Sequence, residues 1–169
     1  ATDREAYQAP FRPLMPGVRF AELGDAAGVE EILAGGTVAA VFIEPIQGEG
    51  GVIPVPFEFL RTLRSLCDRY GALLVFDEIQ CGLGRTGKLF AHQHAGVTPD
   101  IMTLAKPLAG GLPMGAAIVT DAVADALKPG DHGTTFGGGP LVASAALAVV
   151  RAVSDPAFLE GVMERSRHL

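Results

Sequence analysis

Length, composition and charge place this chain among ordinary globular proteins. Its 169 residues, 49% of them hydrophobic and 19% charged, are enough to bury a core and match one globular domain. The net charge of −6, without a basic cluster, argues against nucleic acid or a membrane surface as the main partner. We expect a cytoplasmic protein, because no apolar run has the length of a membrane span, no signal peptide is recognised, and two cysteines make no disulfide framework.

Short apolar runs alternate with amphipathic stretches along the chain. Residues 1–20 hold three prolines and no clear hydrophobic period, which indicates an extended arm or linker. Wholly apolar, β-branched runs bounded by glycine or polar residues are typical of buried parallel strands. Such runs predict strands at residues 38–43, 73–76, 101–104 and 116–119.

Helical spacing and capping residues predict four helices. Asp25 caps the first, Gly71 ends the second, and Asp155 begins the last. The helices are expected at residues 26–34, 57–70, 140–153 and 156–168, with a loop at residues 47–56.

This alternation predicts an α/β fold with a mainly parallel sheet flanked by helices. Ligands of such sheets bind beyond the carboxyl ends of the strands. Glu44, Asp77 and Lys106 all stand at those ends, so we expect the functional site there.

Lys106 has an unusual setting for a lysine. It is the only charged residue between positions 101 and 120, and the glycines and prolines of residues 107–115 leave room for a ligand beside a stiff turn. A desolvated lysine loses its proton readily and forms an imine with an aldehyde, and the obvious aldehyde is pyridoxal 5′-phosphate (PLP). Taken alone, Lys106 could also be a surface lysine that closes a strand.

PLP also needs a carboxylate that keeps its ring nitrogen protonated. Asp77 precedes Lys106 by 29 positions, close to the length of one crossover unit, so neighbouring strands can place both over one pocket. Gln80 is then placed to hydrogen-bond the phenolic oxygen of the ring. The alternative for Asp77 is a cap of the turn after a strand.

Two other motifs suggest nucleotide or metal sites but lack the required context. Residues 82–88 fit a dinucleotide fingerprint and most of a phosphate loop, yet Leu89 replaces the magnesium-binding hydroxyl residue and the acidic strand precedes the glycines. His92 and His94 have no second ligand cluster at suitable spacing, so we predict a surface turn there and no metal site.

Residues 131–140 form a glycine-rich loop before a predicted helix. The hydroxyls of Thr134 and Thr135, together with the free amides and dipole of a helix N-terminus, suit a phosphate group. The alternative is an ordinary glycine-rich loop.

Five segments stand in order along the chain: residues 44–51 (EPIQGEGG), 76–87 (FDEIQCGLGRTG), 99–101 (PDI), 104–111 (LAKPLAGG) and 132–138 (HGTTFGG). Together they resemble the class III, ornithine-type aminotransferases, and most of all the acetylornithine and ornithine aminotransferase branch.

The resemblance implies the central part of the large domain of the PLP-dependent transferase fold type I. It implies a homodimer with active sites at the subunit interface, and a role in arginine biosynthesis. The activity implied is transfer of an amino group from N-acetylornithine or a similar ω-amine donor to 2-oxoglutarate.

The resemblance also assigns roles to residues that bind the cofactor. Lys106 matches the Schiff-base lysine and proton carrier, Asp77 the partner of the pyridine nitrogen, and Gln80 a contact to the ring oxygen. Thr135, beside Thr134, matches a threonine that reaches the cofactor phosphate of the neighbouring subunit.

Three acidic residues match positions that serve the substrate or support the site. Glu49 matches the glutamate that changes partners between the two half-reactions, and Glu44 and Glu78 match supporting residues.

The chain departs from the family pattern in two respects. The family usually has Ser-Thr-Tyr-Gly-Gly-Asn where this chain has Thr134-Thr-Phe-Gly-Gly-Gly139, so a tyrosine hydroxyl and an asparagine amide are lost. The family's N-terminal phosphate loop and its C-terminal small domain with the carboxylate-binding arginine are absent. We therefore expect residues 1–20 to be an arm, 21–154 a PLP-binding segment of the large domain, and 155–169 the start of a helical connection toward a small domain.

Other functions remain open at this point. Another class III enzyme, acting on 4-aminobutyrate, acetyl-lysine or glutamate semialdehyde, would share these motifs. The chain could also be an inactive fragment, or an ATP-binding module if the glycine motif at residues 82–88 binds phosphate.

Overall fold

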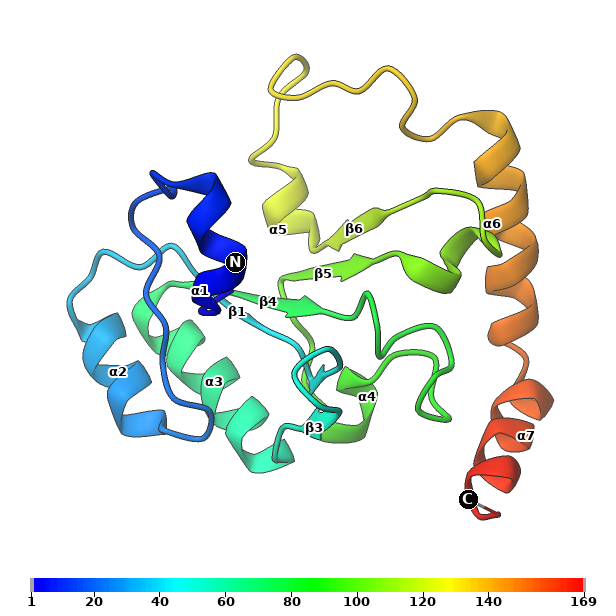
Figure 1. Ribbon diagram of the computed structural model, residues 1–169, viewed down its shortest axis with the longest axis horizontal. Coiled ribbons are helices and arrows are strands. Elements are labelled where there is room, and N and C mark those ends of the chain that lie inside the picture. The colour runs from blue at the N-terminus through cyan, green and yellow to red at the C-terminus, as the bar shows by residue number, and fades with distance from the viewer. Residues whose placement is uncertain (1, 169) are drawn as a thin grey trace.

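A four-stranded sheet organises the chain, with strand order β1-β4-β5-β6 (Figure 1). β1, β4 and β5 are parallel and β6 is antiparallel to β5, which confirms the predicted mainly parallel α/β fold. The computed structural model describes residues 2–168. Ala1 of the predicted arm and Leu169 of the predicted last segment lie outside the described residues.

The elements in chain order are α1 (Glu5–Gln8), η1 (Ala9–Phe11), α2 (Ala26–Ala34), β1 (Ala40–Ile43), β2 (Ile46–Gln47), β3 (Ile53–Pro54), α3 (Phe57–Tyr70), β4 (Leu73–Asp77), α4 (His92–Ala95), β5 (Ile101–Leu104), η2 (Lys106–Ala109), β6 (Ala116–Val119), α5 (Asp121–Ala124), α6 (Pro140–Val153) and α7 (Pro156–Ser166).

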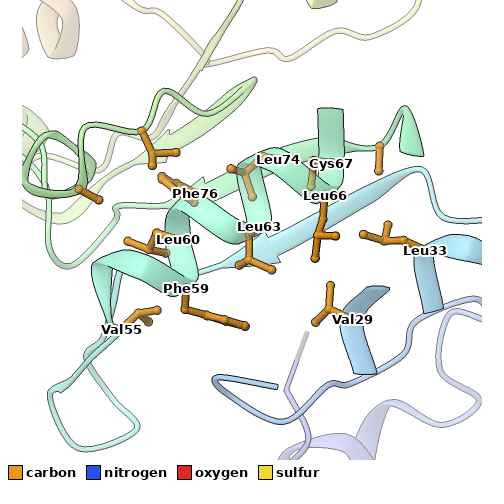
Figure 2. Packing of buried hydrophobic residues seen from close by; sticks show 13 residues of the cluster. Val29, Leu33, Val55, Phe59, Leu60, Leu63, Leu66, Cys67, Leu74 and Phe76 are labelled. Carbon is orange, nitrogen blue, oxygen red and sulfur yellow. The ribbon is translucent and has the colours of Figure 1, made fainter. Parts of the chain in front are cut away.

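The main core lies where α2 and α3 cover one face of the sheet. Figure 2 shows the leucines of α3 gathered with Leu74 and Phe76 of β4 and with Val29 and Leu33 of α2. Leu63 and Phe76 are completely buried, and each such side chain contributes about 1.5–3 kcal/mol. Gly71 ends α3, as predicted, and its backbone is in the left-handed conformation.

A second core holds the turn that carries Lys106. Ala146 and Val153 of α6 pack with Leu104 of β5 and Leu108 of η2. Because α6 begins after the long loop of residues 125–139, which runs along the top of Figure 1, its burial fixes one end of that loop on the body of the chain. Among residues 2–168 no single helix is long and apolar enough to cross a membrane; α6 and α7 meet that test only together, with a bend of 67° between them.

Several short elements differ from the predictions. The predicted loop at residues 47–56 contains part of an antiparallel hairpin of β2 and β3, each only two residues long and therefore too short to show a sequence period. The predicted arm of residues 1–20 includes α1 and η1, neither of which has a buried residue. The surface turn predicted at the histidines is the short helix α4, and the last helix ends at Ser166.

Asp100 joins three strands and a helix at the amino end of the sheet. Its Oδ2 accepts hydrogen bonds from the Leu74 amide at 2.7 Å and from Arg64 Nη1 at 2.8 Å. Its backbone oxygen accepts from the Thr120 amide at 3.0 Å, just after β6. One side chain thereby sets the alignment of β4 with β5 and ties both to α3.

Replacement of Asp100 by alanine is expected to lower the free energy of unfolding by about 2–4 kcal/mol, because it leaves a strand amide without its acceptor and takes from the partly buried guanidinium of Arg64 the less exposed of its two carboxylates. Urea unfolding of the full-length protein measures this. Asp68→Ala is the matched control, since Asp68 also pairs with Arg64 but is exposed, and it should cost less than about 0.5 kcal/mol. Equal losses in the two variants would contradict the assignment.

Candidate active site

Three parallel strands deliver the predicted chemical groups to one edge of the sheet. Glu44 follows β1, Asp77 is the last residue of β4, and Lys106 follows β5 after one residue. In the register of the sheet Asp77 lies beside Thr103 of β5. Because the carboxyl ends of parallel strands meet at the same edge, these residues share one side of the molecule, as predicted.

Lys106 has a strained backbone. Its φ is 41°, in the left-handed region that side-chain-bearing residues rarely adopt, although Pro107 follows it and favours an extended conformation. Such a conformation costs about 1–3 kcal/mol and persists only where the surrounding packing holds it. Here Leu104 on one side and Leu108 on the other are both buried in the second core. The strain therefore fixes the direction in which the lysine leaves the sheet edge.

The side chain of Lys106 contacts Gln80. Lys106 Nζ donates a hydrogen bond to Gln80 Oε1, so the predicted pair of cofactor ligands meets in space. The side chain is exposed in this chain, and the desolvation expected from its apolar sequence neighbours is therefore not found. The reason is that those neighbours pack downward into the second core rather than over the amine.

Asp77 and Thr103 together leave polar atoms at the same edge. Asp77 Oδ1 accepts a hydrogen bond from the Ile79 amide at 2.9 Å. Thr103 Oγ1 is buried and has no hydrogen-bond partner among residues 2–168. A buried hydroxyl without a partner is costly and points to a group that the described chain does not supply. Sequence reasoning missed Thr103, although a hydroxyl residue in an otherwise apolar strand was its signal.

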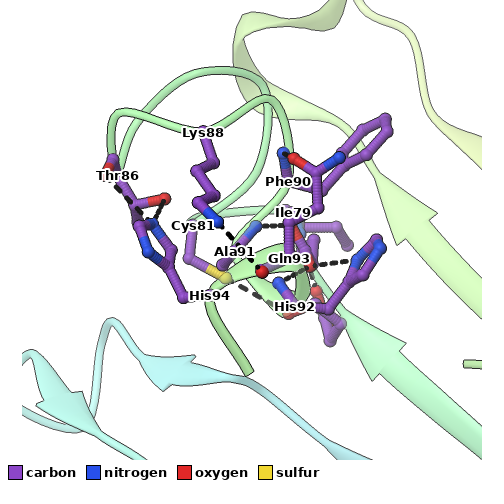
Figure 3. Close-up of polar contacts among 11 residues, drawn as sticks. Ile79, Cys81, Thr86, Lys88, Phe90, Ala91, His92, Gln93 and His94 are labelled. Carbon is purple, nitrogen blue, oxygen red and sulfur yellow. Dashed lines mark hydrogen bonds and ion pairs between the residues drawn. The ribbon is translucent and has the colours of Figure 1, made fainter. Parts of the chain in front are cut away.

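Glu78, the next residue after Asp77, has a different environment. It is buried, with 1% of its surface exposed. Its carboxylate accepts hydrogen bonds from the amides of Ala91 at 2.6 Å and His92 at 2.7 Å, and lies 2.9 Å from His92 Nδ1 (Figure 3). In the structure Glu78 anchors the start of α4 to the end of β4. These contacts hold both ends of the segment between them, which carries Gln80.

Cys81 lies in the same segment but is not a nucleophile. Burial, and after it the negative charge of Glu78, raise the pKa of the Cys81 thiol to about 12. The thiolate form of Cys81 is therefore scarce at neutral pH.

The glycines of residues 82–88 have a packing role. A side chain on Gly87 would place its Cβ 2.1 Å from Met163 Sδ of α7, and one on Gly84 would lie 3.4 Å from Leu159 Cδ2. Both glycines adopt positive φ values, of 85° for Gly84 and 83° for Gly87. The backbone of residues 84–87 thus packs directly against α7. A glycine occurs at position 87 because α7 leaves no room for a side chain, and not because a phosphate group has to approach.

The remaining predicted residues lie in exposed loops. Thr134 Oγ1 accepts a hydrogen bond from the Gly137 amide at 3.1 Å, which forms a local turn, and Thr135 is exposed beside it. Among residues 2–168 no hydrogen bond joins either threonine to Asp77, Gln80 or Lys106. Glu49 is also exposed, and its backbone oxygen accepts a hydrogen bond from Arg4 Nη2 at 3.3 Å.

The groups at the sheet edge fit PLP. They are a primary amine for an aldehyde, a carboxylate for a pyridine nitrogen, an amide for a phenolic oxygen, and an orphan hydroxyl beside the carboxylate. These groups come from β4, β5 and the turns that follow them.

Comparison with known proteins agrees with this chemistry. The family model described as aminotransferase class III matches residues 1–169, so the chain belongs to this family. An acetylornithine aminotransferase described as mitochondrial, from Alnus glutinosa, is 56% identical over 167 residues, which cover 99% of this chain and 37% of the relative. A succinylornithine transaminase of Yersinia pseudotuberculosis is 50% identical over 159 residues, covering 94% of this chain and 38% of the relative.

The fold is shared with solved structures of the same class. The structure of an ornithine aminotransferase from Toxoplasma gondii, crystallized in the presence of oxidized glutathione, matches with a TM-score of 0.83 and 44% identity. The match covers 88% of this chain and 35% of the Toxoplasma chain, and the Toxoplasma structure reveals partial occupancy of PLP at its active site. The chain thus spans less than two fifths of the length of these three relatives.

Glu78→Ala is expected to lower the free energy of unfolding by about 3 kcal/mol, because two backbone amides lose a buried charged acceptor. Thermal and urea unfolding of the full-length protein measure the loss. Glu49→Ala is the control, since its side chain is exposed, and its stability should match that of the wild type within about 0.5 kcal/mol. A stable Glu78→Ala protein would contradict the anchoring role.

Proposed function

We propose that the protein carrying this chain is a PLP-dependent aminotransferase that moves an amino group from N-acetylornithine or a similar ω-amine donor to 2-oxoglutarate. The observation that carries the proposal is the meeting of Lys106 with Gln80, beside Asp77, at the carboxyl edge of the sheet. Membership of the class III family and 56% identity to an acetylornithine aminotransferase support it.

The residues at the sheet edge divide the chemical work. When bound, PLP supplies an aldehyde carbon for an amino group and an electron-poor ring that accepts electrons as a proton leaves the substrate. Lys106 Nζ would hold the aldehyde carbon and, once free, carry the proton at its amine. Asp77 would hold the proton on the ring nitrogen, and Gln80 would donate an amide hydrogen to the ring oxygen.

Glu44 and Glu49 belong to the loop of residues 44–52, which would serve the substrate. Glu44 Oε2 accepts a hydrogen bond from the Gly48 amide at 3.0 Å, so it shapes the loop that carries Glu49. Glu49 is exposed and free to change partners between the two half-reactions. Glu78 would support the site through its anchoring of α4.

We further propose a homodimer in which Thr135, next to Thr134, reaches the cofactor phosphate of the neighbouring subunit. The exposure of Thr135 in the long loop of residues 125–139 supports this arrangement, because the loop leaves the body of its own chain (Figure 1). In this proposal residues 21–154 form the PLP-binding part of a large domain, residues 1–20 an arm, and residues 155–169 the start of a helical connection.

The donor class follows from the relatives rather than from this edge alone. The relatives from Alnus and Yersinia act, by name, on ornithines carrying different acyl groups, and the Toxoplasma enzyme on ornithine. All three donors share a primary ω-amine. We propose the same donor class here, and a cytoplasmic location, which the buried free thiols of Cys67 and Cys81 support because such thiols are typical of reducing compartments.

Lys106→Ala is expected to abolish the covalent adduct that forms when borohydride is added to the full-length protein with PLP. The physical reason is that the substitution removes Lys106 Nζ, the amine that meets Gln80 at the sheet edge. Absorbance and peptide mapping of the reduced protein measure the adduct. Lys88→Ala is the matched control, because Lys88 is exposed and bonded only to the Gln93 backbone oxygen among the described residues. An adduct of wild-type yield in Lys106→Ala would refute the proposed function.

Thr135→Ala is expected to weaken PLP binding by about tenfold, through loss of one hydrogen bond to a charged phosphate. Cofactor titration measures the affinity, with the exposed Thr37→Ala as control. Mixing Thr135→Ala with Lys106→Ala subunits should restore tight binding at one site of each mixed dimer, since that site receives both intact residues. Normal affinity in Thr135→Ala, or no recovery on mixing, would contradict the interface role.

A further inference from the structure

The Gln80 side chain, which contacts Lys106, fills the space that a side chain at position 48 would need. A side chain on Gly48 would place its Cβ 2.2 Å from Gln80 Nε2, 2.3 Å from its Cδ and 2.8 Å from its Cγ. Non-bonded heavy atoms do not approach a Cβ atom this closely. The amide of Gln80 therefore lies where any other residue at position 48 would put its first side-chain atom.

The backbone does not require glycine at position 48. Its φ lies outside the left-handed range, whereas Gly51, in the same loop, has a φ of 127°. An alanine at position 48 would therefore not meet the strain of a left-handed backbone. The Gln80 side chain is thus the reason for a glycine here.

Hydrogen bonds hold the loop in place at Gly48. The Gly48 amide donates to Glu44 Oε2 at 3.0 Å, and the Gly48 oxygen accepts from the amides of Gly51 at 3.1 Å and Val52 at 3.0 Å. The backbone of Gly48 is held from both sides by these hydrogen bonds. Because Gln80 contributes only the far end of a flexible side chain to the clash, an added methyl group would displace Gln80 and leave the fold intact.

Displacement of Gln80 would reach Lys106 directly, because Gln80 Oε1 accepts the hydrogen bond of Lys106 Nζ. We infer that Gly48 is a positioning residue. Because it has no side chain, it leaves the space in which the Gln80 amide lies against Lys106, and it thereby couples the loop of residues 44–52 to the Lys106 amine. The inference deepens the proposed function, on which it rests for the role of Lys106, but the contact between the three residues is independent of any cofactor.

Acylation of Lys106 tests the coupling in the full-length protein freed of PLP. N-hydroxysuccinimidyl acetate is the probe, and mass spectrometry of the Lys106 peptide gives the rate, with Lys88 as internal reference. Gly48→Ala and Gln80→Ala should each raise the rate at Lys106 about 2- to 10-fold, because the amine loses one hydrogen bond. Gly50→Ala is the matched control, since its Cβ would lie 3.4 Å from its nearest neighbours, and it should leave the rate unchanged.

The double variant Gly48→Ala/Gln80→Ala separates positioning from general damage. With Gln80 shortened, the clashing atoms are gone, so the double variant should acylate no faster than Gln80→Ala alone. Unchanged acylation in Gly48→Ala, or effects that add in the double variant, would overturn the inference. If Gly48→Ala fails to fold, recovery of folding in the double variant supports the clash with Gln80, and continued unfolding overturns it.

PLP titration of the same proteins distinguishes this inference from the proposed function. Wild-type protein that binds no PLP would refute the function, while the acylation pattern would still decide the coupling. Wild-type protein that binds PLP, together with Gly48→Ala acylated at the wild-type rate, would refute the coupling alone.

Discussion

The parallel register of β1, β4 and β5 is the constraint on which the site depends. It brings three strand ends, far apart in sequence, to one edge, and it sets Asp77 beside Thr103. The register is fixed at the opposite end of the sheet by Asp100, whose side chain bonds the start of β4. A slip of one residue would turn Asp77 into the core beneath α3, where an unpaired carboxylate is costly.

Successive side chains at the end of β4 point to opposite faces of the sheet, so neighbouring residues have different surroundings. Phe76 points into the core under α3, Asp77 is half-buried at the opposite face, and Glu78 is buried against α4. Two adjacent carboxylates therefore differ in environment: Asp77 accepts one local amide hydrogen bond at the sheet edge, whereas buried Glu78 accepts hydrogen bonds from two amides of a distant segment. The segment from Glu78 to α4 in turn carries Gln80 to Lys106.

Rigid packing surrounds a few strained or exposed groups. Lys106 keeps a left-handed backbone because Leu104 and Leu108, two positions away on either side, are buried in the second core. The glycine turn after Gln80 is covered by α7 through Gly84 and Gly87. At this edge Lys106 is exposed and Asp77 and Gln80 are half-buried, while the elements that hold them pack into the two cores.

The sequence by itself determined the larger elements and the candidate ligands. Hydrophobic period, Asp25 and Gly71 were enough to predict α2, α3 and the strands, because these signals are local. The isolated Lys106 and the Asp77 spacing were enough to suggest PLP. The tertiary structure alone decided the contact of Lys106 with Gln80, the anchoring task of Glu78, the orphan hydroxyl of Thr103 and the space that Gly48 leaves. Each of these depends on atoms brought together from separate strands and loops, and no local pattern in a chain encodes a distance between distant residues.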